Sequence, residues 1–118
     1  METKSVKSYC GYRFMSSSSR TEEYIAFEKA CKRELKKQCA KYGINIHKFL
    51  PNHFEWSAVL ERGGRFVFVS ISDVRFWSNW YSDVLIRTMK HDTDWSGGSN
   101  NFVPFDKIGE RADKLLAD

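Results

Sequence analysis

The sequence predicts an α+β fold, in which an antiparallel sheet of three to four strands packs against a long N-terminal helix and a C-terminal helix. Three observations predict it. Apolar and polar residues alternate on both sides of Gly63-Gly64, which is typical of a β-hairpin because tight primed turns need positive φ. A long apolar stripe with helical spacing precedes this hairpin, and a shorter one follows it. Helices flanking antiparallel strands favour a two-layer arrangement, with the hairpin at the centre of the sheet.

The N-terminal helix is predicted to begin after Ser19 and to run to about Tyr42. Ser19 and Glu22 fit a capping box, in which the hydroxyl and the carboxylate satisfy amides at the helix start. Gly43 suits the residue that follows a helix, where the backbone often turns left-handed. Large apolar side chains recur at steps of three and four residues and define one buried face: Tyr24, Phe27, Cys31, Leu35, Cys39 and Tyr42.

The strands are predicted from short runs that are rich in β-branched and aromatic residues. The first spans residues 44–49 and ends at a turn formed by Pro51 and Asn52. The two hairpin strands span about 53–61 and 65–72, and a further strand spans 83–89. Alternation then places Trp56 and Leu60 on the buried face of the sheet, and Glu55 and Ser57 on the other face.

The ends of the chain complete a single domain over residues 1–118. Residues 1–18 are predicted to form an arm with a short strand from Tyr9 to Phe14, and residues 90–104 a long polar loop. Pro104 and Asp106 are suited to the start of the last helix. Its apolar face is expected to comprise Phe105, Ile108, Ala112, Leu115 and Leu116.

Composition indicates a soluble cytoplasmic protein that does not enter membranes. No apolar run approaches the roughly 20 residues that cross a bilayer, and Met1–Lys4 lacks the apolar stretch of a secretory signal. Aromatic residues make up 15% of the chain, enough large apolar surface to support a core. The odd set of Cys10, Cys31 and Cys39 favours buried, reduced thiols over a disulfide framework.

Charge is distributed unevenly along the chain, whose formal net charge is +4. Residues 1–50 contain eleven Lys and Arg against five Glu, whereas residues 51–118 contain eight against ten Asp and Glu. A basic half favours contact with an acidic partner, such as nucleic acid, a nucleoprotein or an acidic protein surface. A solvated face rich in lysine would give the same composition.

Sequence motifs for metals, cofactors and catalysis are incomplete, so none of these is predicted. Asp92-x-Asp94-x-Ser96-Gly97 matches the opening of a calcium loop, but Val103 stands where the bidentate glutamate belongs. Whether residues 92–101 bind a cation stays open. The cysteines and His47, His53 and His91 lack the spacing of structural zinc sites.

A binding surface is predicted from cations and aromatic rings, because phosphates attract cations and bases stack on exposed rings. The long helix supplies lysines and an arginine, the hairpin tip supplies two arginines, and the connection after the hairpin supplies the rings. The predicted binding residues are Lys29, Lys32, Arg33, Lys36, Lys37, Arg62, Arg65, Arg75, Trp77, Trp80 and Tyr81.

Two alternative functions remain open at this point. One is a metal-dependent nuclease, or a vestigial nuclease core, using Asp73, Glu55 and Glu61; such cores need clustered carboxylates and usually a lysine, and no complete set occurs. The other is a protein–protein interaction module that makes no contact with nucleic acid.

Four segments together resemble a family of short proteins carried by phages and integrative elements of Gram-positive bacteria. The segments are residues 16–24, 51–54, 68–75 and 85–101. The resemblance implies a context and no particular reaction: small proteins of that context bind nucleic acid or inhibit host defence nucleases, as anti-CRISPR proteins do. The expected function is therefore non-enzymatic binding of nucleic acid or of a nucleoprotein complex, with a host defence nuclease as one such partner.

Overall fold

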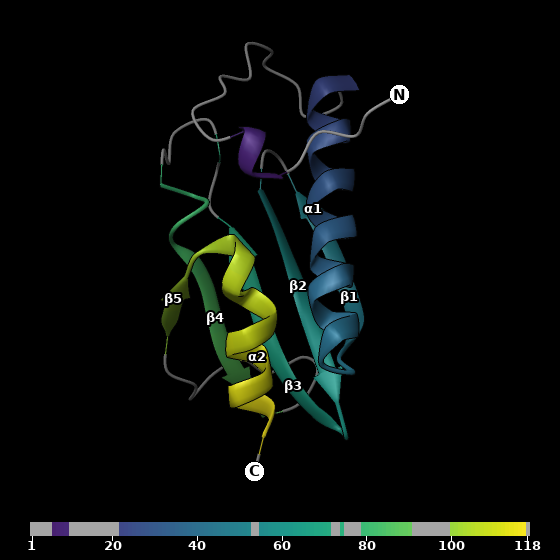
Figure 1. Ribbon diagram of the computed structural model, residues 1–118, viewed down its shortest axis with the longest axis vertical. Helices are drawn as coiled ribbons and strands as arrows, with labels where there is room; N and C mark the ends of the chain where they lie inside the picture. The colour runs from purple at the N-terminus through teal and green to yellow at the C-terminus, as the bar shows by residue number, and fades with distance from the viewer. Residues whose placement is uncertain are drawn as a thin grey trace.

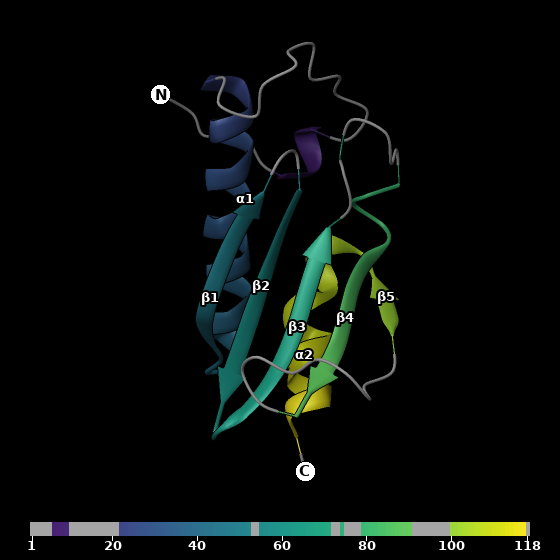
Figure 2. The same ribbon diagram turned by 180° about the vertical axis from the view of Figure 1, so that it is seen from behind.

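Each strand of the sheet pairs with the strand that follows it in the chain, so the order across the sheet is β1-β2-β3-β4-β5 (Figures 1 and 2). The strands are β1 (Asn45–Asn52), β2 (Glu55–Arg62), β3 (Arg65–Ile71), β4 (Val84–Met89) and β5 (Asn101–Val103), and all neighbours are antiparallel. The structure, a computed structural model, describes residues 6–9, 22–52, 55–71, 74, 79–90 and 100–117.

The predicted hairpin is present and joins β2 to β3. Arg62 pairs with Arg65 across the turn, and the register continues without a shift to the pair Trp56 and Ile71. Gly63 and Gly64 have φ values of 62° and 80°. Positive φ at both central positions is the geometry of a type I′ turn, whose twist matches that of the flanking strands. The Gly-Gly pair therefore sets the register of the two central strands.

Two α-helices cover one face of this sheet (Figures 1 and 2). α1 (Glu22–Lys41) comes before the strands in the chain and α2 (Ile108–Leu116) comes after them. Two short 3₁₀ helices, η1 (Val6–Tyr9) and η2 (Phe105–Lys107), precede α1 and α2. α1 ends at Lys41, and Gly43 just beyond it has a φ of 67°, as expected for the residue that follows a helix.

Buried side chains from the sheet and the helices form a single hydrophobic cluster. The alternation in the hairpin strands is confirmed, with Trp56, Ala58 and Leu60 buried on the helix-covered face. The predicted apolar stripe of α1 is also confirmed, since its members are buried apart from Tyr42, which packs against the cluster. In α2 the same holds for Ile108, Ala112 and Leu116, and Leu115 packs at the margin.

The two helices approach each other closely where Gln38 of α1 meets the start of α2. The Gln38 side-chain amide donates to the carbonyl oxygen of Phe105 at 2.9 Å, and its oxygen accepts from the Gly109 N–H at 2.8 Å. A Cβ atom at Gly109 would lie only 2.9 Å from the Gln38 Cβ. Glycine therefore permits this helix contact by its lack of a side chain.

Several predicted boundaries are wrong. The sheet has five strands, because Asn101–Val103 pairs with β4 within the segment predicted as loop. Pro51 and Asn52 end β1 and do not form a turn, since they pair with Trp56 and Glu55. Tyr9 lies in η1 and not in a strand, and it is buried beside Phe27 with Val6 nearby in the same cluster. Burial of these two apolar side chains favours the compact turn.

The other predictions for the N-terminal arm fall on residues that the structure does not describe, including Ser19 of the capping box. The same holds for residues 53, 54 and 72 at the predicted strand ends. Among the helices of the described ranges, none has an apolar stretch long enough to span a bilayer.

Candidate nucleic-acid interface

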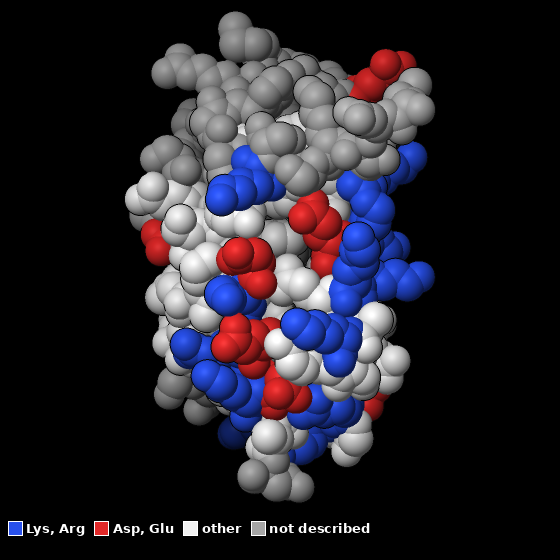
Figure 3. All heavy atoms as spheres, viewed as in Figure 1, with Lys and Arg blue, Asp and Glu red and all other residues white. Residues whose placement is uncertain are grey.

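The outward side of α1 carries a continuous row of cations, here called the α1 cationic face. Steps of three and four residues place its members on one side of the helix: Lys29, Lys32, Arg33, Lys36, Lys37 and Lys41. All six are exposed. Figure 3 shows the blue atoms along the outer edge of α1, whereas blue and red atoms are interspersed over α2. The distance along the axis from Lys29 to Lys41 is about 18 Å, at 1.5 Å per residue.

The lysines of this face make no ion pair with any carboxylate in the described ranges. Two of them lie over aromatic rings: the Lys32 Nζ is 5.6 Å from the Phe49 ring centre, and the Lys41 Nζ is 5.7 Å from that of Tyr42. Glu34, three residues before Lys37 on the same helix, accepts a hydrogen bond from the Val6 N–H. The five lysines of the face are therefore left without a salt-bridge partner among the described residues.

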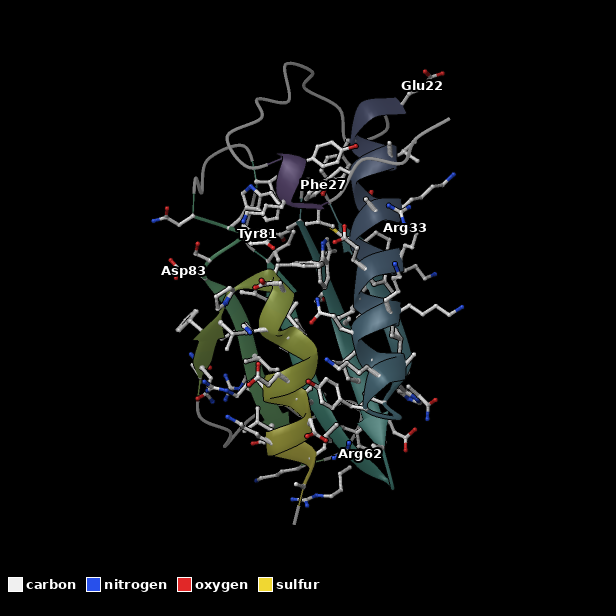
Figure 4. The ribbon with its side chains drawn as sticks, viewed as in Figure 1. Glu22, Phe27, Arg33, Arg62, Tyr81 and Asp83 are labelled. Atoms are coloured by element: carbon white, nitrogen blue, oxygen red, sulfur yellow. The ribbon has the colours of Figure 1, made fainter. Side chains whose placement is uncertain are left out.

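The two hairpin arginines, predicted to bind a partner, contact the chain itself. Arg62 donates to the Tyr42 carbonyl oxygen at 2.9 Å and forms an ion pair with Asp113 at 2.7 Å. It also donates to the Asp113 carbonyl oxygen at 3.2 Å. Figure 4 shows Arg62 at the end of the molecule where the hairpin tip meets both helices. Arg65 is exposed, and its guanidinium donates to the Leu116 carbonyl oxygen at 3.3 Å.

The structure describes two of the predicted aromatic binding residues, and the prediction of an exposed ring is wrong for Trp80. Trp80 is 2% exposed and packs edge-to-face on Phe27, with 5.2 Å between the ring centres. Tyr81 is half-buried and stacks on Phe105 (Figure 4). Trp80 belongs to the core cluster, and Tyr81 packs against it. Arg75 and Trp77 lie outside the described residues.

A groove lies between α1 and β1, here called the α1–β1 groove, with a volume of about 630 Å³. On the α1 side it is lined by Lys32, Lys36, Cys39 and Ala40, and on the β1 side by the consecutive residues 43–49. Sequence reasoning missed this groove. Its signal was the apolar pair Ile44 and Ile46 at the start of a strand, opposite a helix flank that ends in lysine.

The carboxylates of the nuclease alternative do not come together in β2. Glu55 and Glu61 stand at opposite ends of this strand, six residues and therefore about 20 Å apart. Glu61 accepts from the Gly64 N–H and from the Asn45 side chain, and these hydrogen bonds lower the pKa of its carboxyl. Within the described ranges no group of His, Cys, Asp and Glu is placed to hold a metal ion. Asp73 and residues 92–99 of the possible calcium loop lie outside those ranges.

Two cysteines of α1 are buried thiols, as expected from their positions in the apolar stripe. Burial raises the pKa of Cys39 from 9.0 to about 11. Burial raises the pKa of Cys31 further, because this side chain is fully enclosed. Neither thiol is therefore a nucleophile near neutral pH. Cys10 lies outside the described residues.

Comparison with protein-family models, with curated proteins and with solved structures found no match. What this chain binds is therefore inferred from its own surface. Two features of that surface are candidates for binding a partner, namely the α1 cationic face and the α1–β1 groove.

Proposed function

We propose that this protein is a non-enzymatic binding protein that engages nucleic acid, or a nucleoprotein complex, through the α1 cationic face. The observation that carries the proposal is the row of six exposed cations along one helix, with no carboxylate of the described ranges paired to its lysines. A rigid row of positive charge attracts phosphates over long distances and releases their counterions on contact.

The length of the face suits a phosphate backbone. About 18 Å of helix spans roughly ten charges of a DNA duplex, which carries one per about 1.7 Å. Lysine ammonium groups act as mobile point charges and contribute affinity without reading sequence. The protein is thus expected to bind many sequences with similar affinity.

The setting proposed for this activity is the cytoplasm of a host cell that carries a phage or a mobile element. This setting comes from the resemblance to proteins of such elements. There the same face would engage a host defence nuclease that holds its own nucleic acid, in the manner of an anti-CRISPR protein. Because the face is basic, it would contact the bound nucleic acid or an acidic surface, and not a basic nucleic-acid channel.

Fluorescence anisotropy with labelled DNA and RNA, titrated with salt, tests the proposal. We expect affinity to fall steeply as salt rises, with a slope that reports the number of phosphate contacts. The triple variant Lys29→Glu, Arg33→Glu and Lys37→Glu should weaken binding by at least about 100-fold at low salt.

The control is the pair Lys107→Glu and Lys114→Glu, two exposed lysines at and near α2, which reverses two charges against three in the α1 variant. This control changes the net charge in the same direction but should leave most of the affinity intact. The proposal is overturned if the unaltered protein binds neither DNA nor RNA at low salt. It is also overturned if the control pair weakens binding as much as the α1 triple variant does.

A further inference from the structure

The α1–β1 groove has an apolar floor and a basic rim. Ile44 and the half-buried Ile46 and Phe49 contribute apolar surface. Lys32 and Lys36, one helical turn apart, stand on the α1 side. Among the described residues, no Asp or Glu lines the groove. An occupant that fits this surface therefore combines negative charge with apolar side chains.

The groove follows the outer edge of the sheet. Gln38 holds α2 on one flank of α1, and Lys32, Lys36 and Ala40 face the groove from the opposite flank. β1 is an edge strand, paired with β2 alone among the described strands. The outer edge of such a strand presents backbone N–H and C=O groups that can pair with an added extended segment.

Two features of β1 restrict such pairing to a short stretch. The register with β2 shifts between Ile46 and Lys48, so a bulge bends the strand there. Pro51 has no N–H to donate. Edge strands that carry a bulge, a lysine and a proline resist indiscriminate pairing. Pairing at this edge is therefore short, and charge complementarity with the rim must select the partner.

A nucleic-acid strand fits the groove less well than a peptide does. Phosphates gain nothing from the floor of Ile44 and Ile46, and bases need open aromatic faces on which to stack. The Phe49 ring already carries the Lys32 ammonium group on one face. Its other contacts include Trp56, whose ring centre lies 5.1 Å away.

We propose that the α1–β1 groove binds an acidic, extended segment of a partner protein, in which carboxylates alternate with apolar residues. The carboxylates reach Lys32 and Lys36, the apolar residues cover the floor, and the segment pairs briefly with the outer edge of β1. This site goes beyond the proposed nucleic-acid interface, whose other cations, Lys29, Arg33 and Lys37, lie outside the groove lining.

A labelled peptide of alternating glutamate and valine tests the site by fluorescence anisotropy with the unaltered full chain. We expect saturable binding that is lost when every glutamate of the peptide is replaced by lysine. A peptide N-methylated at alternate residues keeps its charge but cannot pair with a strand edge. We expect this peptide to bind at least about tenfold more weakly.

Charge reversal on α1 separates this site from the nucleic-acid interface. The pair Lys32→Glu and Lys36→Glu should weaken peptide binding by at least about tenfold. The matched pair Lys29→Glu and Arg33→Glu, on the same helix and with the same change in charge, should alter it by less than about threefold. Because the second pair also weakens nucleic-acid binding, failure of one proposal is distinguishable from failure of the other.

Amide chemical-shift mapping on the unaltered protein gives a readout that does not depend on the folding of a variant. We expect the peptide to shift the amides of residues 44–49 and of the α1 flank that faces them. The proposal is overturned if the shifts lie elsewhere, if both pairs of variants weaken the peptide equally, or if N-methylation has no effect.

Discussion

Gly109 shows how one residue sets the distance between two helices. Its backbone N–H binds the Gln38 side chain, and a Cβ atom here would lie 3.0 Å from the Gln38 carbonyl oxygen and closer still to the Gln38 Cβ. Both are atoms on or next to the α1 backbone, so a rotamer change cannot relieve the contact. Gly109 is therefore required because a side chain would collide with α1, and not because its backbone adopts a positive φ.

We predict that Gly109→Ala destabilises the protein by about 1–3 kcal/mol, because α2 must move away from α1. The gain in helix propensity, about 1 kcal/mol, offsets part of the cost. Urea unfolding followed by circular dichroism measures the change. Glu110→Ala, at the exposed neighbouring position, serves as the control and should change stability by less than about 0.5 kcal/mol. Equal stability of the Gly109→Ala variant and the unaltered protein would contradict the prediction.

At the scale of a single element, the β2–β3 hairpin depends on its turn for register. Gly63 and Gly64 have positive φ, and added Cβ atoms would meet nothing within 4 Å. Glycine is needed at these two positions because of their positive φ, whereas at Gly109 it is needed because a side chain would not fit. A one-residue slip would turn Trp56, Ala58 and Leu60 away from the core.

We predict that Gly63→Ala destabilises the protein by about 1 kcal/mol, whereas Gly63→Asn is nearly neutral. Alanine resists positive φ, but asparagine tolerates it and is common at this turn position. Thermal unfolding of the two variants measures the difference. If both substitutions lower the melting temperature equally, the cost comes from lost solvation or packing and not from φ.

The elements that sequence reasoning found are those with long periodic patterns. The apolar stripe from Tyr24 to Cys39 has five members along one helix face. The alternation around Gly63-Gly64 extends over both hairpin strands. The three-residue β5 has too few positions to show a period, and it forms because Val103 and Asn101 complete the edge of β4. Pro51 suggested a turn, but an edge strand tolerates proline where no N–H is needed.

The candidate site could be predicted in part for a similar reason. Helical spacing alone placed the lysines of α1 outside, opposite an apolar stripe, and their exposure confirms this. Arg62 and Trp80 do not face a partner because they contact Asp113 and Phe27, which are distant from them in sequence. Composition near a loop cannot distinguish an exposed ring from one that folds back under a helix.

At the scale of the whole molecule, one hydrophobic cluster joins the sheet and both helices. Cys31 and Cys39 lie inside it, with exposures of 0% and 1%. A thiol reagent can reach them only when α1 leaves the sheet. Because α1 contributes to the same core as every long strand, this opening is expected to coincide with global unfolding.

We predict that iodoacetamide labels Cys31 and Cys39 at the rate set by global unfolding, with Cys10→Ser used to remove the third thiol. The Cys39 thiol has a pKa of 9.0 when unfolded and about 11 when folded. Its contribution to the free energy of unfolding is therefore complete below pH 9 and is lost as pH rises toward 11. Mass spectrometry at increasing urea concentration measures the labelling rate of each cysteine. Rapid labelling of either cysteine in the native protein would show that α1 opens independently.

The order in which the elements leave the ribosome has a consequence for how this chain matures. Strand neighbours are also neighbours in sequence, so pairing of β1 through β4 closes only short loops and proceeds early. The part of the apolar sheet face under α2, however, stays open to water until α2 is synthesised, because α2 follows all five strands in the chain. During that interval the nascent protein exposes an apolar surface that is prone to aggregation. At high expression levels the unfinished chain is therefore expected to bind chaperones.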